Sequence, residues 1–229
     1  MLLKMLYPQT CYFCGRINAT PICKKCMEEV DYIEEPRCKK CGKPIRYQEQ
    51  EYCHDCKKRE FFFEQGRSVW LHKGVVAWSI YQFKYHNRRI YGKFYAEEMW
   101  RNYGGKLREW GIELIVPVPL HRKRERRRGY NQSELLARHL GYISGIEVNS
   151  KAVKRVRYTT PQKQLNDKER KRNLKEAFRT TKYWKKKSRV LIVDDIYTTG
   201  NTIDAVAEVL RQNGAEKIWF LTISIGQGF

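Results

Sequence analysis

The eight cysteines of this 229-residue chain all lie within its first 56 residues, as four Cys-x-x-Cys pairs. The pairs are Cys11/Cys14, Cys23/Cys26, Cys38/Cys41 and Cys53/Cys56. Thiolates in groups of four bind zinc tetrahedrally, and paired Cys-x-x-Cys is the usual sequence signature of such a site. Four protein ligands leave no open coordination position, so the pattern predicts two structural Zn²⁺ sites.

Sequential grouping of the pairs, 11/14/23/26 and 38/41/53/56, is the arrangement we favour, although the spacing also permits a crossed one. Gly15 and Gly42 each follow a Cys-x-x-Cys pair, where glycine permits the tight turn under a metal. His54 lies inside the last pair, but a full cysteine set makes it redundant as a ligand. Disulfides or redox dithiols are the alternatives. So short a segment needs metal to fold, and residues 1–62 therefore predict a zinc-ribbon module.

A second chemical pattern is the stretch VLIVDDIYTTGNT, residues 190–202, in which four apolar residues lead into Asp194 and Asp195. The polar loop 198–202 that follows offers backbone N–H groups, hydroxyls and a helix start, which suit a phosphate monoester. The two carboxylates suit ribose hydroxyls, or Mg²⁺ held directly or through water. No Walker-type glycine-lysine motif precedes the loop, which disfavours a nucleoside triphosphatase. The alternative interpretation is a capped helix with two exposed acids.

The elements that would position this stretch belong to an α/β pattern. Apolar runs at 114–118, 190–193 and 217–225 predict strands, and residues 131–141 and 202–212 predict helices. Strands without alternation, separated by helices, indicate a parallel sheet, whose ligands bind beyond the carboxyl ends of the strands. The acid pair lies at such an end.

Other segments are less regular. Residues 67–74 predict a hairpin or a strand leading into a helix, and apolar and aromatic residues between 76 and 95 recur near helical spacing. Residues 122–128 form a basic stretch that we interpret as a loop. The long polar stretch 158–175 is typical of a lid or a disordered segment.

The chain carries 46 Lys and Arg against 25 Asp and Glu, a formal net charge of +21. Such an excess favours anionic partners, namely nucleic acid, phosphorylated small molecules or an acidic membrane surface, although a generally basic protein would also show it. No apolar run reaches the ~18 residues that span a bilayer, and the start lacks the apolar core of a signal peptide. A cytoplasmic location is expected.

The stretch 190–202 resembles the 5-phosphoribosyl-1-pyrophosphate (PRPP) fingerprint of type I phosphoribosyltransferases. The wider chain is similar to the ComF-type competence proteins, which combine that fold with an amino-terminal zinc ribbon. The resemblance rests on residues 116–122 (VPVPLHR), 128–133 (RGYNQS), 160–162 (TPQ) and 169–178 (ERKRNLKEAF), together with the fingerprint and the cysteine pairs.

The resemblance implies an open, mainly parallel sheet flanked by helices over residues 63–229. It implies that the acid pair holds the ribose hydroxyls, that residues 198–202 bind the 5′-phosphate, and that 117–122 form the pyrophosphate loop. Residues 158–178 would close over the site. The expected catalytic residues are Asp194, Asp195, Arg122, Gln162 and Arg170. The expected PRPP-binding residues are Asp194, Asp195, Tyr197, Thr198, Thr199, Gly200, Asn201, Thr202, Pro119, His121 and Arg122.

The resemblance further implies PRPP or a related ribose phosphate as ligand, bound with Mg²⁺, and a role in natural transformation. Two functions are expected: transfer of phosphoribosyl to an unidentified acceptor, or non-catalytic handling of single-stranded DNA with the ribose-phosphate site used for regulation. An ATP-driven DNA translocase is the expected protein partner. Peripheral attachment at the inner membrane face is the alternative to a purely cytoplasmic location.

Overall fold

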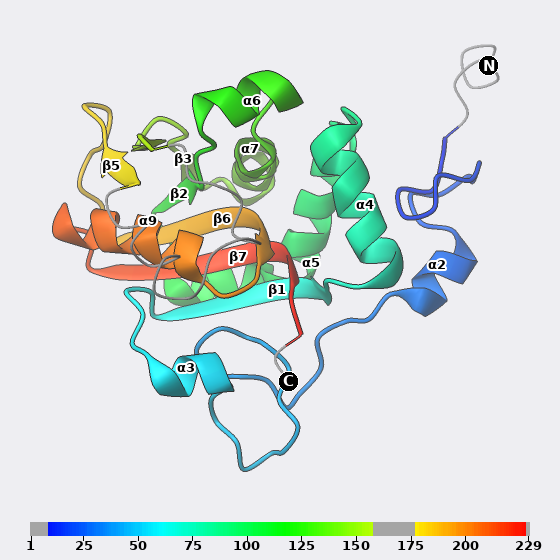
Figure 1. Cartoon of the computed structure of the whole chain (residues 1–229), viewed down its shortest axis with the longest axis horizontal. Helices are drawn as coiled ribbons and strands as arrows, with labels where there is room; N and C mark the ends of the chain where they lie inside the picture. Colours follow the sequence, from blue (N-terminus) through cyan, green and yellow to red (C-terminus); the bar gives the residue numbers. More distant parts are fainter. Residues whose placement is uncertain (1–8, 158–176, 228–229) are drawn as a thin grey trace.

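The computed structural model describes residues 9–157 and 177–227, which surround a central five-stranded sheet (Figure 1). The sheet order is β1-β7-β6-β2-β3, and every neighbouring pair is parallel. Its strands are β1 (Gln65–Leu71), β2 (Leu114–Pro117), β3 (Glu147–Val148), β6 (Arg189–Tyr197) and β7 (Lys217–Ile225). The α/β prediction is confirmed.

Helices cover both faces of this sheet. They are α4 (Gly74–Tyr85), α5 (Tyr91–Trp110), α7 (Gln132–Ser144) and α9 (Asn201–Gln212). Leu191 and Val193 of β6 join one hydrophobic cluster with residues of α5 and α7, whereas Val190 and Ile192 join a second cluster with α9. Because β6 is buried on both faces, its sequence is a continuous apolar run without alternation.

Residues 65–71 form a strand leading into a helix, one of the two arrangements expected there, since β1 pairs in parallel with β7 and α4 follows it. An antiparallel pair, β4 (Val153–Arg155) and β5 (Phe178–Thr180), lies outside the main sheet. Within the described ranges no helix is long and apolar enough to cross a membrane.

The loop expected at residues 122–128 is wrong, because this segment forms helix α6 (Arg122–Arg128). Arginine has a high helix propensity, and the segment contains no glycine or proline. The ring nitrogen of His121 accepts a hydrogen bond from the backbone N–H of Lys123 at the start of the helix, and Gly129, with φ +79°, ends it.

The expected end of α7 at Gly141 is also wrong, because the helix continues to Ser144 and is capped by Gly145, with φ +74°. A Cβ at Gly141 would lie 2.2 Å from a methyl carbon of Val148. Glycine is needed at position 141 for the close approach of β3, so here it marks packing within the helix.

The cysteine-rich segment forms two small units, each with a short helix: α2 (Lys24–Glu29) in the first and α3 (His54–Lys58) in the second. In Figure 1 the first ribbon lies beside α4, and the second lies below β1. Cys11, Phe13 and Cys26 of the first ribbon belong to the hydrophobic cluster of α5 and α7. The second ribbon contributes its buried cysteines to the opposite cluster, which contains α9.

Candidate functional site

Asp194 and Asp195 lie near the carboxyl end of β6, which extends beyond the predicted strand to Tyr197. The end of β2 is directly beside them, since the backbone N–H of Val118 donates to the carbonyl of Val193 at 2.9 Å. The acid pair therefore lies at the carboxyl edge of neighbouring parallel strands, the usual ligand position in an open α/β sheet.

The carboxylate of Asp194 is held by two donors. The Ser133 hydroxyl, at the start of α7, donates to Oδ1 at 2.6 Å, and the backbone N–H of Asp195 donates to the same oxygen at 2.9 Å. Burial and the neighbouring charge of Asp195 raise the pKa of Asp194 to about 7. This carboxyl group is therefore poised to change its charge near neutral pH.

Asp195 is buried and forms an ion pair with Lys84 of α4, with 3.0 Å between Oδ1 and Nζ. Both side chains are largely covered, so solvent screens their attraction only weakly. Sequence reasoning missed Lys84, because a lysine in an aromatic-rich helix looks like a surface residue. Sequence reasoning also assigned no role to Ser133, although this residue is the last of the segment 128–133 on which the family resemblance rests.

Residues 198–202, the expected phosphate loop, form the turn after β6 and the first two residues of α9. Gly200 has φ +79°, a backbone conformation that glycine adopts without strain, and it is the N-cap of the helix. The side-chain oxygens of Thr199 and Tyr197 are buried without a hydrogen-bond partner among the described residues. A loop with unused donors at the positive end of a helix dipole has the chemistry to bind an anion.

Tyr197 supports the loop from within the core. Its ring is buried and stacks parallel on Phe220 with 4.6 Å between ring centres. A Cβ at Gly200 would lie 2.4 Å from the Tyr197 hydroxyl oxygen. Tyr197, one of the expected PRPP-binding residues, therefore lies underneath the loop.

The expected pyrophosphate segment lies between the end of β2 and α6. Pro119, which is buried, His121 and the exposed Arg122 line a groove of about 710 Å³ together with residues of α7 and β4. Burial and the positive charges of Arg155, Lys123 and Arg124 lower the pKa of His121. Gln162 and Arg170 lie outside the described residues.

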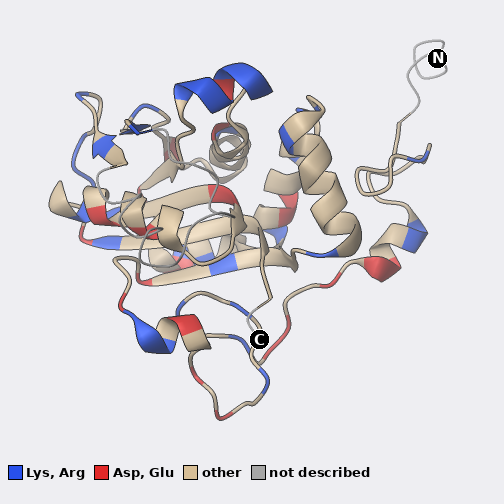
Figure 2. Cartoon of the chain, in the orientation of Figure 1, with Lys and Arg blue, Asp and Glu red and all other residues tan. Residues whose placement is uncertain are grey.

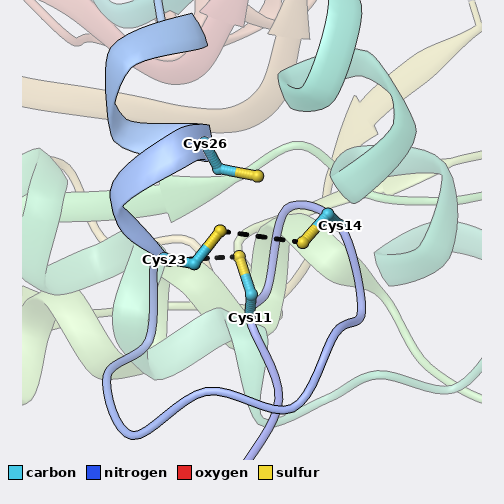
Figure 3. A group of neighbouring side chains, drawn as sticks. All are labelled: Cys11, Cys14, Cys23 and Cys26. Carbon is cyan, nitrogen blue, oxygen red and sulfur yellow. Dashed lines mark hydrogen bonds between the residues drawn. The ribbon is translucent and has the colours of Figure 1, made fainter.

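The cysteines form the two predicted groups of four. In each group the four Sγ atoms lie within 4.8 Å of one another, and the grouping is sequential. Figure 3 shows Cys11, Cys14, Cys23 and Cys26 converging, with 3.8 Å between the Sγ atoms of Cys14 and Cys23. Tetrahedral zinc with Zn–S bonds of about 2.3 Å requires S···S separations of about 3.8 Å.

The second group has the same geometry, with 3.6 Å between the Sγ atoms of Cys41 and Cys53. Gly15 and Gly42 have φ +75° and +78°, as the tight turns require. His54 belongs to neither group, and its ring is exposed. Both sites therefore have the ligand set and spacing of structural zinc sites.

Two family models match the chain: the double zinc ribbon domain over residues 2–57 and the phosphoribosyl transferase domain over residues 126–224. The parallel sheet, its flanking helices and the two cysteine groups agree with both. The molecule is thus a phosphoribosyltransferase fold preceded by a double zinc ribbon.

Curated relatives narrow the class further. Competence protein F of Haemophilus influenzae is 43% identical over 108 residues, covering 46% of this chain and 47% of the relative. The DNA utilization protein YhgH of Salmonella typhimurium is 42% identical over 119 residues, covering 50% and 52%. Competence protein ComFC of Bacillus subtilis is 28% identical over 155 residues, covering 66% and 59%. The chain is a homologue of the ComF/YhgH-type competence proteins, and it spans about half the length of the first two.

Among solved structures, a purine phosphoribosyltransferase from Pyrococcus horikoshii matches with a TM-score of 0.36 and 23% identity, covering 56% of this chain and 70% of that chain.

Proposed function

We propose that this protein binds PRPP or a related ribose phosphate and transfers its phosphoribosyl group to an acceptor, with release of pyrophosphate, during DNA uptake. The observation that supports this proposal most strongly is the acid pair near the end of β6, followed directly by the phosphate loop. In that loop the Thr199 hydroxyl is buried without a hydrogen-bond partner among the described residues. The names of the relatives, competence and DNA utilization proteins, support the biological setting.

In this proposal the carboxylates of Asp194 and Asp195 accept hydrogen bonds from the ribose hydroxyls, and residues 198–202 bind the 5′-phosphate. Bound Mg²⁺, held by the same carboxylates directly or through water, would offset the charge of the pyrophosphate group. In the unliganded site the ammonium group of Lys84 lies 3.0 Å from Oδ1 of Asp195 and offsets its negative charge.

The proposed reaction breaks the bond between C1′ and the pyrophosphate oxygen, and the electron pair leaves with pyrophosphate. A nitrogen of the acceptor then forms a bond to C1′ and releases its proton to solvent. His121 and Arg122, beside the groove, would contact the departing pyrophosphate. Gln162 and Arg170 would join them. The protein would act mainly by holding opposite charges where charge develops.

Pyrophosphate release from PRPP tests the transfer, measured against a panel of nucleobases, ammonia and single-stranded DNA. Release that requires one acceptor and is lost in Asp195→Asn would support it. Bound PRPP without release across the whole panel would contradict catalysis while leaving ligand binding in place.

A second function, handling of single-stranded DNA with the ribose-phosphate site as a regulator, is favoured by one surface. The α4–α6 rim consists of Tyr81, Tyr85, His86 and Arg128 together with the basic helix α6, which is blue in Figure 2. Tyr81 lies 5.0 Å from Tyr85 and 5.4 Å from His86 between ring centres, and the Arg128 guanidinium lies over Tyr85 at 4.9 Å. Exposed aromatic rings beside cations are suited to stacking bases and contacting phosphates.

Fluorescence anisotropy with labelled oligothymidine at several salt concentrations tests this rim. Tyr81→Ala with Tyr85→Ala should weaken binding by about tenfold or more, because each stacked base contributes ~1–3 kcal/mol. Tyr142, which is 90% exposed on α7, provides the control Tyr142→Ala. Equal affinity in the rim variant and the control would exclude the rim as the DNA surface.

We also propose that the protein acts in the cytoplasm or at the inner face of the membrane beside an ATP-driven DNA translocase. The resemblance to competence proteins and the net charge of +21 support this setting. Co-purification of the tagged protein with such an ATPase from competent cells is expected. Recovery without any ATPase, at any stage of competence, would argue against that partner.

A further inference from the structure

A short arm connects the second zinc ribbon to the sheet and runs along α9. This ribbon arm, residues 59–64, begins one residue after α3, the helix that carries the zinc ligand Cys56. Its far end is held by Arg211 of α9, which donates to the carbonyl of Phe62 at 3.1 Å and pairs with Glu64. The arm therefore joins the ribbon to the helix that follows the phosphate loop.

The first residue of the arm, Arg59, reaches into the phosphate loop. Its Nη2 donates to the carbonyl oxygen of Thr199 at 3.0 Å, and its Nη1 donates to the side-chain oxygen of Asn201. The guanidinium also lies 4.0 Å from the ring centre of Phe61. Two donors from one planar group thus fix two loop residues, a geometry that lysine cannot reproduce.

This contact sets the direction of the loop donors. In a trans peptide the C=O and the next N–H point in opposite directions. Because the Thr199 carbonyl points to Arg59, the Gly200 N–H points to the other side of the loop. Arg59 therefore orients a donor that a phosphate would use, and it adds a positive charge beside the loop.

Two further contacts of the arm hold the loop at its base. The backbone N–H of Phe62 donates to the Asp204 carboxylate in the first turn of α9 at 2.7 Å. A Cβ at Gly200 would lie 3.0 Å from the Phe61 ring, so the aromatic side chain packs directly against the loop. The phosphate loop is thus built on the ribbon arm as well as on Tyr197.

The two ribbons differ in their contacts with the phosphate loop. The second shares a hydrophobic cluster with Tyr197 and Ile203, on either side of the phosphate loop, and Lys43 lies over the Tyr197 ring at 5.9 Å. The contacts of the first ribbon go to the opposite face, where the Ser79 hydroxyl donates to the carbonyl of Tyr12, and Tyr12 packs on Tyr91.

We propose that the second zinc ribbon forms part of the ribose-phosphate site. Arg59 is the positioning residue that holds the phosphate loop in its anion-binding conformation. Loss of metal from the second cysteine group would then loosen the loop, whereas loss from the first would not. The part concerning affinity rests on the proposed function, while the coupling between ribbon and loop is a property of the unliganded protein.

The test uses the full chain and two readouts: hydrogen exchange of the amides at 198–204 without ligand, and calorimetric binding of ribose 5-phosphate. Arg59→Ala should accelerate exchange in the loop and weaken binding by about 10- to 100-fold, because two charge-assisted hydrogen bonds are lost. Arg59→Lys should fall between, since it keeps the charge but not both bonds. Arg16→Ala, an exposed arginine of the first ribbon, is the matched control and should change neither readout.

A second pair of variants tests the metal dependence. Cys56→Ser, in α3, should accelerate loop exchange, whereas Cys26→Ser, at the equivalent place in α2, should not, although each loses one zinc. Normal loop exchange in both Arg59→Ala and Cys56→Ser would overturn the inference. If the wild-type protein binds no ribose phosphate, but the variants differ from it in loop exchange as predicted, the proposed function would be contradicted and the coupling between ribbon and loop would stand.

Discussion

At the scale of single residues, the acid pair combines two carboxylates with different environments. Asp195 forms an ion pair with Lys84, whereas Asp194 accepts hydrogen bonds from two neutral donors of the described chain, the Ser133 hydroxyl and the backbone N–H of Asp195. Burial and the neighbouring charge of Asp195 raise the pKa of Asp194, against the smaller opposing effect of its hydrogen bonds. In the proposed function, these two acids of a protein of net charge +21 would accept hydrogen bonds from the hydroxyl groups of a ligand that also carries phosphates.

The raised pKa predicts a pH-dependent stability. The folded state holds the Asp194 proton from about pH 4 to about pH 7, so this stabilisation is present at low pH and is lost as the pH rises through 7. Asp194→Asn cannot ionise and keeps an oxygen for both donors. We expect the variant to exceed wild type by roughly 1–3 kcal/mol at pH 8, with the difference shrinking towards pH 5. Urea unfolding across this range checks it, and a pH-independent difference would contradict it.

Gly200 offers a second residue-scale prediction. Gly200→Ala should destabilise the chain by about 1–3 kcal/mol and abolish ribose-phosphate binding, because φ is +79° and the new Cβ would meet Tyr197 and Phe61. Gly145→Ala is the matched control, since Gly145 has φ +74° but open space around it. Equal losses of stability in thermal unfolding would show that backbone conformation alone, without the packing against the arm, accounts for the effect.

At the scale of elements, the sequence was informative where burial controls the pattern. The apolar runs of β2, β6 and β7 predict strands because both faces are covered, and the fingerprint, residues 190–202, contains most of β6 and the turn that follows it. Helix α6 was missed, because a run of cations resembles a solvated loop and its caps, His121 and Gly129, became evident only in three dimensions. The contacts of Lys84 and Arg59 join residues more than 100 positions from their partners, and no local pattern encodes such pairs.

The zinc ribbons carry the element-scale prediction. With sequential sites, Cys14→Ser combined with Cys26→Ser should remove one of two zinc ions, whereas Cys14→Ser combined with Cys41→Ser should remove both. Zinc content per chain, measured by elemental analysis, distinguishes the two. Loss of both ions in the first double variant would contradict the sequential assignment.

At the scale of the whole molecule, both zinc ribbons share hydrophobic clusters with the sheet and its helices. Phe13 of the first packs edge-on against Trp70 of β1, and the second shares its core with Phe63 and Phe220. The expected division at residues 62 and 63 describes the order of the sequence motifs, while hydrophobic contacts cross it in both clusters. Sequence motifs could predict each part, but they carry no information on how the parts share a core.

These shared cores predict cooperative unfolding. Zinc release, tryptophan fluorescence and far-UV circular dichroism should change together in urea, because neither ribbon buries its apolar residues without the sheet. Zinc release at a clearly lower urea concentration, with the sheet signal retained, would show that the ribbons are independent units.

Ribose-phosphate binding by the acid pair and the phosphate loop is tested most directly by calorimetric titration of PRPP with Mg²⁺ into wild type, Asp195→Asn and Asp195→Ala, with zinc content measured for each. We predict saturable binding of one PRPP per chain in wild type and its loss in both variants, with two zinc ions retained. Wild type that fails to bind, or variants that bind as tightly as wild type, would contradict the assignment of this site.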